Sequence, residues 1–320
     1  MTRLANAVRA GDRMALARAI TLVESTRDPD RKQAEQLLTV LLPSTGNALR
    51  IGISGAPGAG KSTFIEALGD RVTRSGKRLA VLAVDPSSQR SGGAILGDKT
   101  RMAALAHNPA AFIRPTASGL TAGGVARRTR EVMLLAEAAR FDPVLVETVG
   151  VGQSETAVAE MVDLFVLLVG PGSGDDLQGI KRGAMELADL VVITKADGDL
   201  AQAAARALAD YRAALSLMRP KFTDAPARIM KVSSVVGTGI AEAWEALQDL
   251  DRQLRAGGRL TLLRQDQARR WFWSEVRAVM AEKIAADPAI AAQAAKLEDA
   301  VLNGRLLPQA AARDIVGVLR

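Results

Sequence analysis

The fold of this chain is decided by Gly55-Ala56-Pro57-Gly58-Ala59-Gly60-Lys61-Ser62. This stretch matches G-x-x-x-x-G-K-[ST], a loop whose glycines let successive backbone N–H groups converge on phosphate oxygens. The apolar run before it, 49–54, is typical of a buried strand, and the segment after it, 62–68, is typical of the start of a helix. Strand, loop and helix in this order predict a nucleoside triphosphate site at the positive end of the helix dipole.

We expect the whole loop to contact the nucleotide. Lys61 is expected to reach the β- and γ-phosphates, as a catalytic candidate, and the hydroxyl of Ser62 is expected to bind Mg²⁺. The alternative is a glycine-rich turn that fits the pattern by chance, and the flanking strand and helix argue against it. The predicted nucleotide contacts are Gly55, Ala56, Pro57, Gly58, Ala59, Gly60, Lys61, Ser62 and Thr63.

Three carboxylates are candidates for catalysis and for holding Mg²⁺. Glu147 ends an apolar run, and an acidic residue at the end of a parallel strand beside the loop is well placed to hold Mg²⁺ through water. Gly150 follows it and offers a backbone N–H to the γ-phosphate, as switch segments do. Asp85 and Asp98 are candidates for binding Mg²⁺ or positioning water. Either aspartate could instead be a helix N-cap, and Asp98 directly precedes a helical stretch.

A second motif, Thr194-Lys195-Ala196-Asp197, predicts which base is bound. The carboxylate of Asp197 can accept hydrogen bonds from N1–H and N2–H₂ of guanine, whereas adenine offers neither donor. The aliphatic stem of Lys195 can lie on the base plane. Thr194 stands where such motifs usually have Asn, so one amide contact is missing or replaced. Ser233 and Ser234 are expected to complete the base pocket.

The rest of the chain predicts an α/β protein. Seven apolar runs without polar alternation are typical of parallel strands buried on both faces. They predict a mostly parallel seven-stranded sheet with helices on both faces, the last helices lying over 199–216 and 238–257. The runs are 49–54, 79–84, 111–114, 144–147, 164–169, 190–194 and 228–232.

Helical extensions are predicted at both ends of this sheet domain. Residues 1–46 form an N-terminal extension of two helices separated by a turn at Asp28-Pro29-Asp30, and the sheet domain covers 47–257. Residues 258–320 form a C-terminal extension, with one long helix over 259–285 and two shorter ones. Two tryptophans on that long helix either dock on their own domain or form an oligomer interface.

Composition excludes several classes of site. The chain has 320 residues, no cysteine and one histidine, so there is no disulfide, thiol nucleophile or thiolate metal site. The net charge of +7 is spread along the chain with few aromatic residues, which favours phosphate-bearing ligands and not nucleic acid. No apolar run reaches the length of a membrane span and no secretory signal is present, so we expect a cytoplasmic protein without a membrane partner.

Together and in this order, these segments are similar to the MeaB/ArgK family of P-loop GTPases, which includes the methylmalonic aciduria type A protein. The resemblance covers nearly the whole chain. Its most specific parts are Val84-Asp85-Pro86-Ser87-Ser88 and the run from Glu147 to Glu155, ETVGVGQSE. The GAPGAGKST loop, GGAILGDKTRM and TKAD add to it.

The resemblance implies a homodimeric GTPase that binds GTP or GDP with Mg²⁺. It also implies a partner, the adenosylcobalamin-dependent methylmalonyl-CoA mutase, for which such proteins gate cofactor loading and prevent inactivation. Residues 172–183 match the third switch of the family, in which Asp175, Gln178 and Lys181 couple hydrolysis to the partner. Hydrolysis is expected to be slow alone and faster in the complex, because the sequence shows no preset arginine finger or general base.

Three alternatives stay open at this point. A metal-insertion GTPase is disfavoured by the lack of cysteine and the single histidine. A kinase would need an acceptor pocket and a base to deprotonate the acceptor. A scaffold would bind nucleotide without hydrolysing it.

Overall fold

One parallel sheet of seven strands lies at the centre of the computed structural model, in the order β3-β2-β4-β1-β5-β6-β7. Each neighbouring pair of strands is parallel. The predicted α/β fold is confirmed, and each predicted strand differs from the observed one by a few residues at most. The strands are β1 Arg50–Gly55, β2 Leu79–Asp85, β3 Ala111–Ala117, β4 Val144–Thr148, β5 Leu164–Val169, β6 Leu190–Ile193 and β7 Arg228–Lys231.

The structure describes residues 1–85, 102–117, 122–148, 154–172, 181–218, 221 and 226–318. The chain divides into two compact units, Met1–Leu263 and Arg264–Arg320. Along the described residues, no helix combines the length and the apolar character that a membrane crossing requires.

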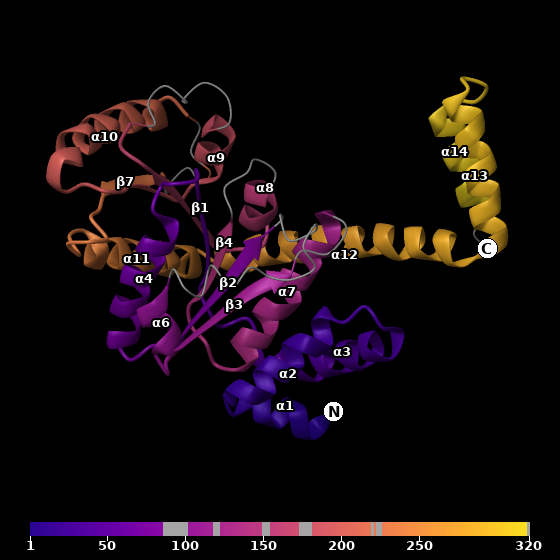
Figure 1. The fold of residues 1–320 in the computed structure, drawn as a ribbon, viewed down its shortest axis with the longest axis horizontal. Helices are drawn as coiled ribbons and strands as arrows, with labels where there is room; N and C mark the ends of the chain where they lie inside the picture. The colour runs from indigo at the N-terminus through magenta and orange to yellow at the C-terminus, as the bar shows by residue number, and fades with distance from the viewer. Residues whose placement is uncertain are drawn as a thin grey trace. The chain divides into compact units, whose positions relative to one another are not determined.

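The apolar runs form central strands because both faces of the sheet are covered. Side chains of β1, β4 and β5 are buried along their whole length. One face packs against α4 Lys61–Arg74, α6 Ala103–His107 and α11 Ile240–Ala256. The other packs against α7 Ala122–Ala138, α8 Ser154–Ala159 and α9 Lys181–Leu187, and α10 Ala201–Ser216 packs along β6 and β7 (Figure 1).

The order of the strands changes direction between β4 and β1: β2 and β3 lie on one side of this pair, and β5, β6 and β7 lie on the other. The helix that follows β1 covers one face of the sheet, whereas the helix that follows the adjacent β4 covers the other. In open parallel sheets, ligands bind in the crevice at the carboxyl ends of two such strands. The glycine-rich loop after β1 lies at that point.

The N-terminal extension contains three helices where two were predicted. They are α1 Thr2–Arg9, α2 Arg13–Glu24 and α3 Asp28–Leu41, and they pack against α7 (Figure 1). The additional break lies at Gly11, whose φ is +79° and where a Cβ atom would clash with Nη1 of Arg78. The carboxylate of Asp12 then caps α2. The predicted turn at residues 28–30 is instead the first turn of α3, where proline is tolerated.

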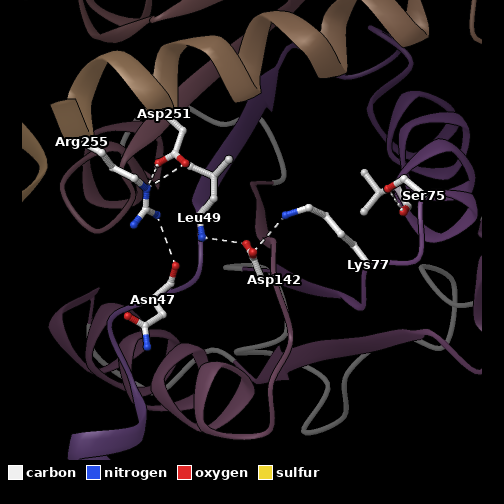
Figure 2. Close-up of polar contacts among 8 residues, drawn as sticks. Asn47, Leu49, Ser75, Lys77, Asp142, Asp251 and Arg255 are labelled. Atoms are coloured by element: carbon white, nitrogen blue, oxygen red, sulfur yellow. Dashed lines mark hydrogen bonds and ion pairs between the residues drawn. The ribbon is translucent and has the colours of Figure 1, made fainter.

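The segment that enters β1 is held by hydrogen bonds at the amino end of the sheet. Asp142, just before β4, accepts from the backbone N–H of Leu49 at 3.0 Å and from Nζ of Lys77 at 3.1 Å (Figure 2). From α11, the guanidinium of Arg255 donates to the backbone oxygen of Asn47 at 3.3 Å. These contacts fix the start of the strand whose other end carries the glycine-rich loop.

The C-terminal part of the chain is helical, as predicted. Helix α12 spans Arg259–Ala286, and α13 Pro288–Leu302 and α14 Pro308–Val318 follow it. Helix α13 begins where the carboxylate of Asp287 caps the N–H groups of its first turn. The predicted boundaries of the three parts of the chain, 1–46, 47–257 and 258–320, remain predictions.

Candidate functional site

The loop between β1 and α4 has the backbone geometry of an anion site. Gly58 and Gly60 adopt φ values of +79° and +87°, which side chains rarely tolerate. Gly60 is the N-cap of α4, so no side chain at that position occupies the N–H groups of the first turn. A hydrogen bond of 3.0 Å from the N–H of Ala59 to the oxygen of Ala56 closes the turn. The first turn of a long helix therefore presents its positive end, and its N–H groups, to any anion at this loop.

Lys61 lies across this loop. Its Nζ donates to the backbone oxygen of Gly55 at 2.7 Å and to that of Ala56 at 3.2 Å. Lys61 is half-buried and is itself the first residue of α4, so its positive charge is held at the loop that precedes the helix. Two positive features thus converge on one small volume, which favours a polyphosphate over a neutral ligand.

Ser62, in the first turn of α4, and Glu147, near the end of β4, lie close together. The hydroxyl oxygen of Ser62 lies 3.4 Å from Oε1 of Glu147, which is buried at the end of β4. Glu147 lies opposite Ile53 in the register of β4 and β1, which places it at the same edge of the sheet as the loop that leads from β1 to Ser62. A serine hydroxyl and a carboxylate are oxygen ligands of the kind that Mg²⁺ takes in phosphate-binding sites.

The described side chains do not enclose a metal ion by themselves. Among the described residues, no three carboxylate or imidazole side chains gather closely enough to hold one. Mg²⁺ usually keeps several waters and binds through one or two carboxylates together with substrate phosphates. Ser62 and Glu147 fit that pattern, in which the nucleotide supplies the remaining ligands.

Several predicted site residues lie outside the described part of the chain. They are Asp98, Gly150, Asp175 and Gln178, and their predicted roles stay predictions. Asp85 ends β2, one residue beyond the pair formed by Val84 and Thr148, so its backbone lies at the same carboxyl edge as Glu147. Lys181 is the first residue of α9.

The predicted base-reading segment follows β6 at the same edge of the sheet. Lys195 has a φ of +54°, a left-handed conformation that is uncommon for a residue with a side chain. The N–H of Ala196 donates to the oxygen of Val232 at 3.0 Å, which holds the segment against the end of β7. Asp197 is half-buried directly after it.

The two predicted serines differ in their surroundings. Ser233 is buried, and its hydroxyl accepts a 3.1 Å hydrogen bond from the backbone N–H of Val236. Its backbone N–H and oxygen pair with Thr238 and Gly237, so this residue shapes the turn after β7. Ser234 is half-buried beside it.

Sequence reasoning did not assign a role to a buried hydrogen-bonded chain behind the loop. Thr148 donates to the hydroxyl of Ser54 at 2.8 Å, and Ser54 donates to Oε1 of Glu155 at 3.0 Å. All three side chains are buried, and they join β4, β1 and α8. The sequence feature that could have indicated it is the serine at the end of an apolar run, because a hydroxyl buried in a strand needs a hydrogen-bond partner.

Comparison with known proteins decides the family. Residues 16–289 match the family model described as methylmalonyl Co-A mutase-associated GTPase MeaB. This chain belongs to the MeaB family. The match covers both the glycine-rich loop and the predicted base-reading segment, and it makes the chain a P-loop GTPase.

Relatives of this MeaB-family chain are similar over most of their length. A probable GTPase of Mycobacterium tuberculosis is 51% identical over 315 residues, 98% of this chain and 94% of the relative. The mouse protein named methylmalonic aciduria type A homolog, mitochondrial, is 48% identical over 94% of this chain and 75% of its own. GTPase ArgK of Escherichia coli is 52% identical over 83% of this chain and 80% of its own.

A solved structure is similar to this chain in both fold and sequence. The crystal structure titled LAO/AO transport system kinase has a TM-score of 0.80 and 40% sequence identity. The similarity covers 99% of this chain and 97% of that one. The fold of this MeaB-family chain is therefore also that of a crystallised relative.

Proposed function

We propose that this chain is a GTP-hydrolysing chaperone of an adenosylcobalamin-dependent methylmalonyl-CoA mutase, gating cofactor loading and protecting the mutase from inactivation. The observation that carries the proposal is the match of residues 16–289 to a family described as mutase-associated GTPases. The mouse relative, named for methylmalonic aciduria, supports the same metabolic context. Hydrolysis is slow in the isolated protein and faster in the complex.

The geometry supports GTP or GDP with Mg²⁺ as the ligand of this site. The loop from Gly55 to Thr63 binds the phosphates, Lys61 neutralises their charge, and Asp197 reads guanine. Ser62 and Glu147 hold Mg²⁺, which would stabilise charge on the phosphate oxygens. Gly150 and the carboxylates Asp85 and Asp98 serve the γ-phosphate side. Asp175, Gln178 and Lys181 report nucleotide state to the mutase.

We further propose that the protein is a homodimer assembled through its C-terminal helices. In the unit Arg264–Arg320, Phe272 and Trp273 of α12 are 60% and 54% exposed, and their rings meet edge to face with centroids 5.3 Å apart. Exposed aromatic pairs of this kind are enriched where a second chain packs. Sedimentation equilibrium of the full chain and of Phe272→Ser/Trp273→Ser tests this. The full chain should sediment with the mass of a dimer, and the double variant with the mass of a monomer.

The decisive experiment measures GTP hydrolysis with and without the mutase. Purified chain, mutase and adenosylcobalamin are combined, phosphate release is followed, and complex formation is tested by size exclusion with GDP and with a non-hydrolysable GTP analogue. We expect co-elution that depends on the nucleotide and stimulation by at least about tenfold. The Lys61→Ala variant controls for contaminating hydrolases. Equal rates with and without the mutase would overturn the chaperone proposal while leaving the GTPase in place.

A kinase is the second candidate, because the solved structure with 40% identity carries that title. The same loop and Lys61 would then direct the γ-phosphate to an acceptor other than water. Labelled γ-phosphate should appear as inorganic phosphate if the chain is a GTPase. Its transfer to a protein or small molecule would favour the kinase.

A further inference from the structure

The hydroxyl of Thr194 joins two segments that are far apart in the sequence. Its Oγ1 donates to the backbone oxygen of Ala59 at 2.7 Å, across a separation of 135 residues. A second carbonyl oxygen, that of Val169, lies 3.2 Å away. The side chain is only 2% exposed, so this contact is made in the interior.

Only one of the two carbonyls needs the hydroxyl proton. A threonine hydroxyl donates a single hydrogen bond. The oxygen of Val169 already accepts from the backbone N–H of Thr194 at 2.8 Å, as part of the β5–β6 connection. The contact with Ala59 is shorter, and we assign the proton to it. This bond therefore links β6 to the phosphate-binding loop.

Both ends of this link are positions that the nucleotide site depends on. Ala59 precedes Gly60, the left-handed N-cap of α4, and a Cβ atom on Gly60 would lie 4.0 Å from Oγ1 of Thr194. Thr194 precedes Lys195, whose backbone is left-handed. The next residue, Ala196, is bound to the end of β7 by its N–H. The base-reading segment is thus held to the phosphate loop on one side and to the sheet on the other.

We infer that Thr194 is a positioning residue, which fixes the spacing between the phosphate half and the base half of the nucleotide site and does not contact the base. The inference rests on the proposed guanine nucleotide site. It answers the question raised by the threonine at a position where such motifs usually have Asn. The hydroxyl binds the loop, and recognition of the base is left to Asp197.

This role has a specific thermodynamic signature. A link that preorganises the site lowers the ordering cost of binding for every ligand that spans both halves. Loss of this link lowers the affinities for GDP and for inosine diphosphate by the same factor. The two ligands differ only in the 2-amino group of guanine, which the Asp197 carboxylate would accept from. A residue that contacted the 2-amino group would instead change the ratio of the two affinities.

The test compares hydroxyl-free and hydroxyl-bearing variants. Thr194→Val is nearly isosteric and removes the donor, whereas Thr194→Ser keeps it. Thr194→Ala provides the same readout if valine is not tolerated. Thr73→Val is the matched control, because the Thr73 hydroxyl also donates to a carbonyl oxygen, that of Gly69 within α4. Affinities for GDP and inosine diphosphate are measured by titration calorimetry, well below the melting temperature of each nucleotide-free protein.

We expect Thr194→Val to weaken both ligands about tenfold, which matches the loss of one buried hydrogen bond, with their affinity ratio unchanged. Thr194→Ser and Thr73→Val should stay within about threefold of the parent chain. A changed ratio, or an unchanged affinity in Thr194→Val, would overturn the inference. If the parent chain itself fails to bind GDP, the proposed function fails instead, and the two failures are thereby distinguished.

Discussion

The hydroxyl groups of Ser54 and Thr148 lie 2.8 Å apart beneath the nucleotide loop, and Thr148 is the donor. The hydroxyl of Ser54 in turn donates a hydrogen bond to the carboxylate of Glu155 at 3.0 Å. The carboxylate is the last member of this series of hydrogen bonds, because an ionised carboxylate can only accept hydrogen bonds. Strand β1, which carries the loop, is thus bound to β4 and α8 by side chains as well as by the sheet.

We predict that Ser54→Ala destabilises the protein more than Thr148→Val does. The alanine variant leaves Glu155 buried without its hydroxyl donor, at a cost of about 2–3 kcal/mol. The valine variant removes one terminal donor while Ser54 still serves Glu155, at about 1 kcal/mol. Urea unfolding of the nucleotide-free protein gives both values. Equal losses in the two variants would contradict the assignment of Thr148 as donor to Ser54 and of Ser54 as donor to Glu155.

Glu147→Gln is predicted to slow hydrolysis without preventing nucleotide binding. The amide keeps the shape of the side chain beside Ser62 but removes the charge that would hold Mg²⁺. We expect kcat to fall about a hundredfold. The affinity for GDP in EDTA should be unchanged.

The control for this prediction is Ser62→Ala, which removes the other predicted metal ligand. It should raise the Mg²⁺ concentration needed for half-maximal activity. An unchanged Mg²⁺ dependence in both variants would show that the metal is held elsewhere, for example through Asp85 or Asp98.

Asp197→Asn is predicted to exchange the preferred base. The carboxylate accepts from N1–H and the 2-amino group of guanine, whereas an amide presents a donor that suits the 2-oxygen of xanthine. GDP affinity should fall at least about a hundredfold and xanthosine diphosphate should become the better ligand. Competition against a fluorescent nucleotide measures both. Equal losses for the two bases would indicate that Asp197 supports the loop without reading the base.

Most strands of the sheet could be predicted, because the apolar pattern that marks a buried strand lies within the strand's own residues. Strands buried on both faces are continuous apolar runs, and β5 was located to the residue for that reason. The proximity of Ser62 and Glu147 could also be expected, since Glu147 lies at the carboxyl end of a parallel strand and Ser62 follows the loop at the carboxyl end of the neighbouring one.

What could not be predicted depends on partners distant in the sequence. The break at Gly11 is enforced in part by Arg78, which approaches the glycine in the folded protein. The role of Glu155 depends on Ser54, 101 residues earlier. From the motif alone, Thr194 indicates only that an amide contact with the base is missing. In the fold, its hydroxyl donates a hydrogen bond to the backbone oxygen of Ala59 in the glycine-rich loop.

Asp189, directly before β6, carries a buried carboxylate. Burial raises its pKa above the ordinary value of 3.8, although Lys221 and the N–H of Phe165 act in the opposite direction. The unfolded chain therefore ionises at lower pH than the native protein. The contribution of this group to stability is fully present below pH 3.8 and is lost as the pH rises through the native pKa.

Asp189→Asn removes this dependence while keeping an oxygen for the N–H of Phe165. We expect the stability of the variant, relative to the parent chain, to rise with pH from about 4 and then to level off once the native carboxyl is ionised. Urea midpoints at a series of pH values measure the difference, and Lys221→Met should enlarge its total change by removing the positive charge that lowers the pKa of Asp189. A difference that falls with rising pH would mean that the attraction of Lys221 outweighs the cost of burying the carboxylate.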